Sequence, residues 1–184
     1  TMSQASYKMP GSKPKIGLSA CLAGFEVRYD GKHKRSSLCL DELSKHFSFE
    51  TFCPEAAAGF GIPRPKMRLT GNPSRPTLRY NDDTDLTGIN LGPQLLEGCK
   101  EALDSFGSLD GFVLMKNSPS CGVRNVKIFQ SDSTIHQQGG MGLFAAALKE
   151  RFPLLPIEEE VNLHDESQYM EFVKRVHAHF KSRK

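Results

Sequence analysis

Apolar residues recur along this chain in short runs, and their spacing alternates between that of a strand and that of a helix. Short apolar or alternating runs predict strands at residues 13–21, 47–52, 111–116 and 154–157. Apolar side chains at helical spacing predict helices at residues 37–47, 92–106, 142–151 and 166–184. Because the two kinds of element alternate, we expect an α/β fold of three layers (α/β/α), with helices on both faces of a mostly parallel, doubly wound sheet.

One long segment breaks this pattern. Residues 59–76 contain three glycines and four prolines, a composition that predicts a long ordered loop without regular structure. Residues 78–87 are expected to form a short strand and a turn. The chain shows no internal repeat and no interdomain linker, so residues 15–184 are expected to form a single domain. Residues 1–14 are expected to be a disordered or tag-derived N-terminal segment.

The apolar runs are all far shorter than the roughly 20 residues of a membrane-spanning helix. The first residues also lack the apolar core of a secretory signal. The sequence therefore predicts a cytoplasmic protein without a membrane partner. Its hydrophobic fraction of 38% and charged fraction of 24% are those of a globular domain.

The net charge of +3 comes from the two ends of the chain. Eight of the 24 basic residues lie in acid-free terminal segments, at Lys8, Lys13, Lys15, Lys174, Arg175, Lys181, Arg183 and Lys184. The body keeps 16 basic and 21 acidic residues, a net charge of about −5. Because a nucleic-acid-binding surface needs a basic stripe, we expect no DNA partner, and thiolated RNA is possible but not favoured.

Three of the five cysteines share one setting. Cys21, Cys53 and Cys121 each lie at or just beyond the end of a predicted strand. The carboxyl ends of parallel strands meet at one edge of a sheet, so these three thiols can converge, although they can also be unrelated loop cysteines. Cys39 and Cys99 lie on the apolar faces of predicted helices and are expected to be small buried hydrophobes.

If the three thiols converge, their chemistry narrows what they can bind. Three thiolates without a nearby histidine favour an iron–sulfur cluster over a hard cation. Clusters usually have four cysteine ligands, so a set of three leaves one iron open for chemistry. Two alternatives stay open, namely a non-enzymatic electron carrier or redox sensor, and a structural zinc site with a fourth ligand.

Polar residues beside these cysteines are candidates for catalysis and binding. Glu55 follows Cys53-Pro54 and is either a general acid or base, or simply an acid at a helix start or on the surface. The residues before Cys121 (KNSPS, 116–120) can face a ligand or form an ordinary turn. Asp30 can cap a helix or orient a substrate. Residues 139–142 (GGMG) are rich in glycine but lack the lysine and the spacing of a phosphate loop.

Seven short motifs, taken together and in order, resemble the thiouracil desulfidase (TudS) family. They are LSACL (18–22), RYDG (28–31), CPE (53–55), PRP (63–65), TDLT (84–87), SPSCG (118–122) and GMG (140–142). The resemblance covers roughly residues 15–160. It implies a three-layer α/β domain that binds a [4Fe–4S] cluster and replaces the sulfur of a thiolated pyrimidine by oxygen without net redox change.

The resemblance also implies roles for individual residues. Cys21, Cys53 and Cys121 match the cluster ligands, Glu55 matches the catalytic acid or base, and Ser118 matches a serine that positions the substrate. The further residues expected to bind substrate are Ser19, Asp30, Asn117 and Ser120. The expected substrate is a small thiolated nucleobase or nucleoside, and the expected product is sulfide.

Overall fold

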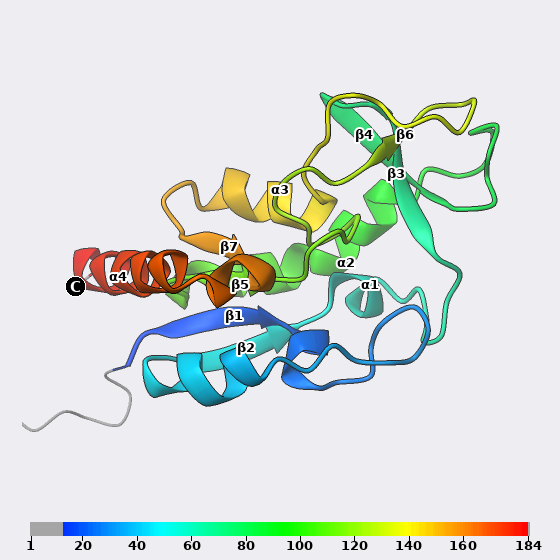
Figure 1. The fold of residues 1–184 in the computed structure, drawn as a ribbon. Coiled ribbons are helices and arrows are strands. Elements are labelled where there is room, and N and C mark those ends of the chain that lie inside the picture. Colours follow the sequence, from blue (N-terminus) through cyan, green and yellow to red (C-terminus); the bar gives the residue numbers. More distant parts are fainter. Residues whose placement is uncertain (1–12, 184) are drawn as a thin grey trace, which may run out of the picture.

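The central sheet of this protein has four strands that all run in parallel (Figure 1). The structure is a computed structural model, and it describes residues 13–183. In their order across the sheet the strands are β2 (Ser48–Phe52), β1 (Lys15–Ser19), β5 (Phe112–Leu114) and β7 (Ile157–Glu159). The α/β architecture with a parallel sheet that the sequence predicts is confirmed.

Helices cover both faces of this sheet, which makes the three predicted layers (Figure 1). One face packs against α2 (Gly92–Ser105) and α3 (Leu143–Arg151), and the other against α4 (Glu166–Ser182). Buried side chains on the α2 and α3 side are Cys99, Leu103, Phe112, Leu114, Phe144 and Leu148. Those on the α4 side are Ile16, Leu18, Cys39, Val113, Phe172 and Val176. Alternate residues of β5 point into the two cores, as the pleat of a strand requires.

A second, three-stranded sheet was not expected from the sequence. Its strands are β4 (Arg75–Tyr80), β3 (Met67–Asn72) and β6 (Ile128–Phe129), with β3 antiparallel to β4 and parallel to β6. The prediction that residues 59–76 lack regular structure is therefore wrong over their second half. Pro73 lies in the turn between β3 and β4, and Pro76 lies on an edge strand, where a missing N–H is tolerated.

Three elements predicted from the sequence differ in type or in bounds from those in the structure. Residues 37–47 do not form one regular helix but a π-helical turn (Leu38–Glu42) followed by a 3-10 turn (Leu43–Lys45). The strand predicted at 154–157 is shifted along the chain, because β7 begins only at Ile157 and ends on the buried Glu159, while Leu154 is 87% exposed. The strand predicted within 78–87 begins earlier, at Arg75. Further short elements are α1 (Pro54–Ala57) and 3-10 turns at Ala20–Ala23, Phe106–Ser108 and Glu160–His164.

Most of the predicted N-terminal segment lies outside the described residues. Of residues 1–14, the structure describes Lys13 and Pro14, whose contacts are with Ser44 and Ser48. Within residues 13–183, none of the helices has the length and hydrophobicity needed to cross a bilayer.

A buried carboxylate ties the end of the last helix to the central sheet. Asp110 precedes β5 and is fully buried, and its carboxylate accepts hydrogen bonds from Arg183 (Nε at 2.7 Å, Nη2 at 2.8 Å) and from His179 Nδ1 (2.7 Å). Burial alone would raise the pKa of Asp110, but the bonds from Arg183 and His179 outweigh burial and hold this pKa below its usual value. Folding therefore favours the ionised form of Asp110.

We expect Asp110→Asn to lower the free energy of unfolding by about 2 kcal/mol at pH 7, because it removes the charge that Arg183 and His179 satisfy. Since the pKa is lowered in the folded state, the contribution is present above the ordinary carboxyl pKa of about 4 and is lost as the pH falls further. Urea unfolding at several pH values measures both effects. Asp104→Asn is the matched control, because Asp104 makes an exposed ion pair with Arg151. An equal loss in both variants would contradict the assignment.

Candidate functional site

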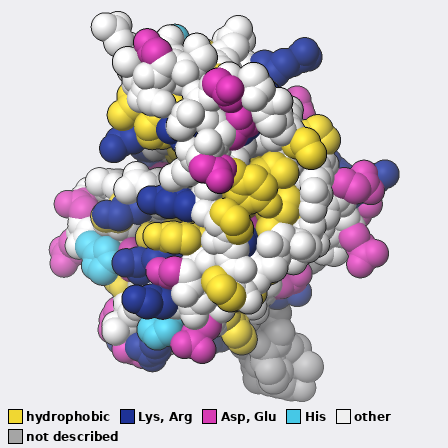
Figure 2. Space-filling view, turned by 90° about the vertical axis from the view of Figure 1, so that its right-hand side faces the viewer, with side chains coloured by type: hydrophobic (Ala, Val, Ile, Leu, Met, Phe, Trp, Pro, Cys, Tyr) yellow, Lys and Arg dark blue, Asp and Glu magenta, His cyan; other side chains and the backbone are white. Residues whose placement is uncertain are grey.

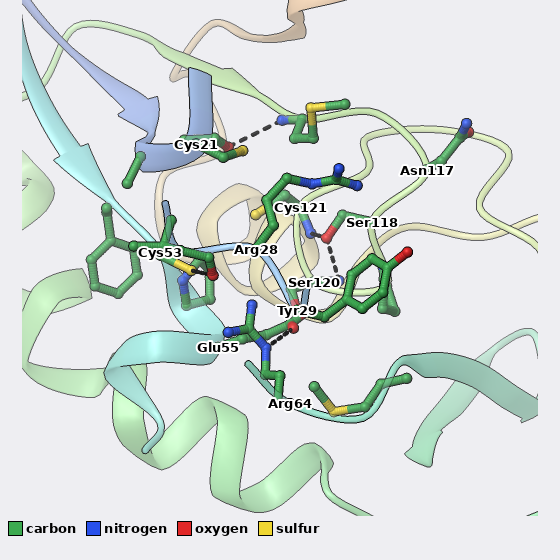
Figure 3. Close-up of a pocket in the computed structure, with 18 of the residues that line it drawn as sticks. Cys21, Arg28, Tyr29, Cys53, Glu55, Arg64, Asn117, Ser118, Ser120 and Cys121 are labelled. Carbon is green, nitrogen blue, oxygen red and sulfur yellow. Dashed lines mark hydrogen bonds and ion pairs between the residues drawn. The ribbon is translucent and has the colours of Figure 1, made fainter. Parts of the chain in front are cut away.

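A cavity of about 330 Å³ opens where β1, β2 and β5 end (Figure 3). Because the three strands are parallel neighbours, the segments that follow them emerge at the same edge of the sheet. The cavity is lined by residues 19–21, 27–29, 52–55, 64, 66–67 and 115–121. The strand ends therefore bring together segments that lie up to a hundred residues apart in the sequence.

Cys21, Cys53 and Cys121 all line this cavity and enter it from three different segments (Figure 3). Cys21 and Cys121 are buried, Cys53 is half-buried, and all three thiols are free. Cys39 and Cys99 are fully buried in the two cores and do not line the cavity, as the sequence predicts. The structure thus separates three cysteines that can hold a ligand from two that pack as hydrophobes.

The three thiols are close enough to influence each other's ionisation. Burial raises the pKa of Cys21 to about 11, and the Cys53 thiol is the next cause. Burial also raises the pKa of Cys53 and that of Cys121, for Cys121 again with the Cys53 thiol as the next cause. Thiols of this kind ionise when they bind a metal, because the metal replaces the proton.

The donor set fits an iron–sulfur cluster better than it fits one metal ion. Across residues 13–183, no three Cys, His, Asp or Glu side chains are placed to share a single ion. Structural zinc requires four ligands around one point, so the zinc alternative finds no site in this part of the chain. A cluster instead uses thiolates as ligands to different irons, and three soft thiols around one cavity meet that requirement.

Glu55 lies in the first turn of α1, directly after the Cys53 segment, and its carboxylate is buried at the cavity wall (Figure 3). Its Oε1 accepts a hydrogen bond from Arg64 Nε (2.8 Å), and its Oε2 accepts one from Ser120 Oγ (2.7 Å). Pro54 stands at the first helical position, where its missing N–H costs nothing. Two partners from different segments therefore fix the orientation of this carboxylate.

The predicted serine and asparagine residues lie at the cavity with distinct contacts. Ser118 Oγ accepts hydrogen bonds from the N–H groups of Ser120 (3.1 Å) and Cys121 (3.0 Å), so it shapes the turn that carries Cys121. Ser19 is 3% exposed, and its Oγ accepts a bond from the Met115 N–H (3.1 Å). Asn117 is exposed at the cavity and has a left-handed backbone conformation (φ 61°).

Asp30 is the predicted substrate-binding residue that the structure places elsewhere. Its side chain is exposed and does not line the cavity. Its Oδ1 accepts a hydrogen bond from the Lys32 N–H two residues on (3.0 Å), the usual way in which an aspartate closes a turn. Arg28 and Tyr29, the two residues before Asp30, line the cavity instead.

Four basic side chains at the cavity were not assigned from the sequence. Arg64 pairs with Glu55, whereas Arg28, Lys66 and Lys116 make no ion pair within the described residues. Arg28 and Lys66 both lie 5.6 Å from the centre of the Tyr29 ring. One signal was available for Arg64, because it lies in the PRP motif (63–65), one of the seven motifs that carry the family resemblance.

The glycines at 139–142 serve close packing rather than phosphate binding. A side chain at Gly142 would place its Cβ 2.5 Å from the carbonyl carbon of Ser120. The first N–H groups of α3 donate to the carbonyls of Pro119 and Ser120 (2.9–3.1 Å). The start of α3 is therefore hydrogen-bonded to the segment that ends in Cys121, and Gly142 allows the two backbones to approach closely.

Comparisons with known proteins agree with this architecture. Residues 16–160 match the family model described as 2-thiouracil desulfurase. YbbK of Bacillus subtilis (strain 168) is 28% identical over 150 residues, which are 80% of this chain and 97% of YbbK. The solved structure of the [4Fe–4S]-dependent thiouracil desulfidase TudS is 27% identical, with a TM-score of 0.64 over 86% of this chain and 99% of that one.

The family match spans the strands whose ends carry the three cysteines, and it includes Glu55, Arg64 and the Cys121 segment. Both relatives are covered almost completely, so the likeness extends over their whole length. This chain therefore belongs to the 2-thiouracil desulfurase family.

Proposed function

We propose that this protein is a [4Fe–4S]-dependent desulfidase that replaces the thiocarbonyl sulfur of a thiolated pyrimidine by oxygen and releases sulfide. One observation carries the proposal: three thiols and a buried, oriented carboxylate line the same cavity. The family and the solved TudS structure support this chemistry. The reaction balances as C=S plus water giving C=O plus hydrogen sulfide, without any change of oxidation state.

Cys21, Cys53 and Cys121 would hold the cluster, each through its own thiolate. When bound, the cluster supplies an iron without a protein thiolate, a soft Lewis acid suited to thiocarbonyl sulfur. The cavity can hold cluster and substrate together only if the substrate is small. A single pyrimidine, with or without its sugar, meets this condition better than a folded RNA.

Glu55 would accept the proton of the water that attacks the thiocarbonyl carbon. Arg64 and Ser120 each occupy one lone-pair position of its two oxygens, and an ionised carboxylate has about four such positions. The remaining positions can receive a water, while the two partners hold the carboxylate at one orientation. Geometry of this kind is what general base catalysis requires.

Ser118 would position the substrate with its hydroxyl proton. Its oxygen already accepts the N–H groups of Ser120 and Cys121, so its lone pairs are engaged and its O–H remains available as a donor. Because Ser118 lines the cavity, this donor can meet a carbonyl oxygen or ring nitrogen of a pyrimidine.

The rival function, a non-enzymatic electron carrier or redox sensor, receives less support. Such a protein usually gives every iron a cysteine, and neither Cys39 nor Cys99 lines the cavity. A buried carboxylate held by Arg64 beside the cluster ligands also has no role in electron transfer. Both features favour an enzyme.

The mouth of the cavity favours a substrate that carries a phosphate. Arg28, Lys66 and Lys116 line it without carboxylate partners within the described residues. Figure 2 shows several Lys and Arg side chains in one region of this face, with Asp, Glu and His side chains beside them. Cations left unpaired at a cavity attract an anionic group, and a nucleoside monophosphate carries one on the sugar that is attached to its base.

The first prediction concerns the cluster ligands. We expect Cys21→Ala, Cys53→Ala or Cys121→Ala to sharply lower the iron bound per chain and the brown absorbance after anaerobic reconstitution, because each removes one thiolate. Cys39→Ala and Cys99→Ala are the matched controls and should retain iron near the wild-type level. A Cys53→Ala protein with full cluster occupancy would refute this ligand set.

A second prediction concerns Glu55, measured as sulfide released from 2-thiouridine and 4-thiouridine under anaerobic conditions. Glu55→Gln keeps the size of the side chain but cannot accept the proton, so kcat should fall by about 10² to 10⁴. Ser118→Ala should cost less, since it removes a positioning contact. Iron content should stay at the wild-type level in both. Wild-type turnover by an iron-loaded Glu55→Gln protein would exclude the proton-transfer role.

The third prediction concerns substrate form. A thiouridine 5′-monophosphate should have a KM about three- to tenfold lower than the nucleoside, and this advantage should shrink with added salt. Lys66→Gln should reduce the advantage and leave the nucleoside unaffected. Lys149→Gln, on the exposed side of α3, is the control. Equal KM values for nucleoside and nucleotide would show that the three cations do not bind phosphate.

A further inference from the structure

Arg64 is a buried cation in the cavity wall, and hydrogen bonds beyond its ion pair with Glu55 hold it in place. Its side chain is 3% exposed, and three contacts fix it. Its Nε donates to Glu55 Oε1 (2.8 Å), its Nη1 donates to the carbonyl of Gly61 (2.9 Å), and its backbone N–H donates to the carbonyl of Tyr29 (2.8 Å). The guanidinium therefore has one position relative to Glu55 and the cavity.

One terminal nitrogen of this guanidinium, Nη2, makes no hydrogen bond within the described residues. Five N–H donors are available, one on Nε and two on each terminal nitrogen. Glu55 and Gly61 engage Nε and Nη1, whereas no residue of the described chain accepts a hydrogen bond from Nη2. Arg68 and Arg79 have unpartnered nitrogens sealed inside the protein, but no nitrogen of Arg64 is sealed in this way. Arg64 lines the cavity together with Glu55 (Figure 3), and Nη2 is the nitrogen of its guanidinium that no described residue engages.

We propose that Arg64 is a specificity-determining residue, which donates from Nη2 to the carbonyl oxygen that a 2-thiolated pyrimidine carries at C4. The inference rests on the proposed desulfidase function. A guanidinium has donors and no acceptor, so it distinguishes a carbonyl from an amino group at the same ring position. It thereby selects 2-thiouracil rings over 2-thiocytosine rings, in which C4 carries an amino group.

The energetic reason for this selection is the cost of placing two donors against each other when the ring covers Nη2. With a uracil-type ring, Nη2 forms a charge-assisted hydrogen bond to the ring oxygen at the wall of the cavity. With a cytosine-type ring, the amino group and the guanidinium present donors to each other, and both remain unpaired. One such bond to a charged group corresponds to a discrimination of about 10- to 100-fold.

A purely structural role for Arg64 makes a different prediction. If Arg64 only held Glu55 in place, its loss would slow the reaction of both rings by the same factor. The ratio of the two kcat/KM values would then stay unchanged. Discrimination between the rings, not the rate alone, is therefore the informative quantity.

The experiment compares 2-thiouridine with 2-thiocytidine on cluster-loaded protein, as anaerobic sulfide release. The variants are Arg64→Gln, Arg64→Lys and, as a charge-matched control, Arg151→Gln, whose arginine pairs with Asp104 on the surface. We expect the wild type and Arg151→Gln to favour 2-thiouridine by about 10- to 100-fold in kcat/KM. This ratio should fall close to one in Arg64→Gln and should be partly kept in Arg64→Lys.

A binding measurement, which does not depend on turnover, completes the test. Calorimetry on the same proteins should give uridine a lower Kd than cytidine, with the preference lost in Arg64→Gln, while iron per chain stays constant. An unchanged ratio in Arg64→Gln, or equal values for both rings in the wild type, overturns the proposal. If Arg64→Gln does not fold, Arg64→Lys and the wild-type ratios decide. Failure to release sulfide from any thiopyrimidine would instead refute the proposed function, and the two Kd values would still test Arg64.

Discussion

The parallel pairing of β1 with both β2 and β5 is the constraint on which the site depends. It places the residues after three strands at one edge of the sheet, so Cys21, Cys53 and Cys121 reach a common cavity. Gly17 makes the pairing possible, because a Cβ there would lie 2.2 Å from the ring of Phe112 on β5. The contacts at the site therefore depend on the close packing of β1 against β5.

The cavity also depends on a buried charge pair that connects three distant segments. Glu55 follows β2, Arg64 comes from the loop before β3, and Ser120 comes from the segment after β5. A buried ion pair contributes little net stability, and losing either partner leaves an uncompensated buried charge. Retaining such a pair makes sense when its members act on a ligand, and here both line the cavity.

The segment that carries Cys121 is held from several directions at once. Ser118 binds two of its N–H groups, the first turn of α3 binds its carbonyls, and Glu159 at the end of β7 accepts the N–H of Val123 (2.8 Å). Backbone contacts of this kind fix a thiol in position without adding bulk near the cavity. A metal ligand on such a segment is oriented before the metal binds, which lowers the cost of ordering it.

Local features of the sequence determined the strands β1, β2 and β5, the helices α2, α3 and α4, and the three cysteines and Glu55 that follow the strands. These features depend on residue spacing and on motifs of three to five residues, which can be recognised without knowing what lies across the fold. Only the tertiary structure decided that residues 67–80 form a second sheet and that Asp30 turns away from the cavity. It also decided that Arg64 meets Glu55 inside the cavity and that Asp110 binds the end of α4. Each of these outcomes depends on a partner distant in the chain or on the direction of one side chain, and periodicity carries no information about either.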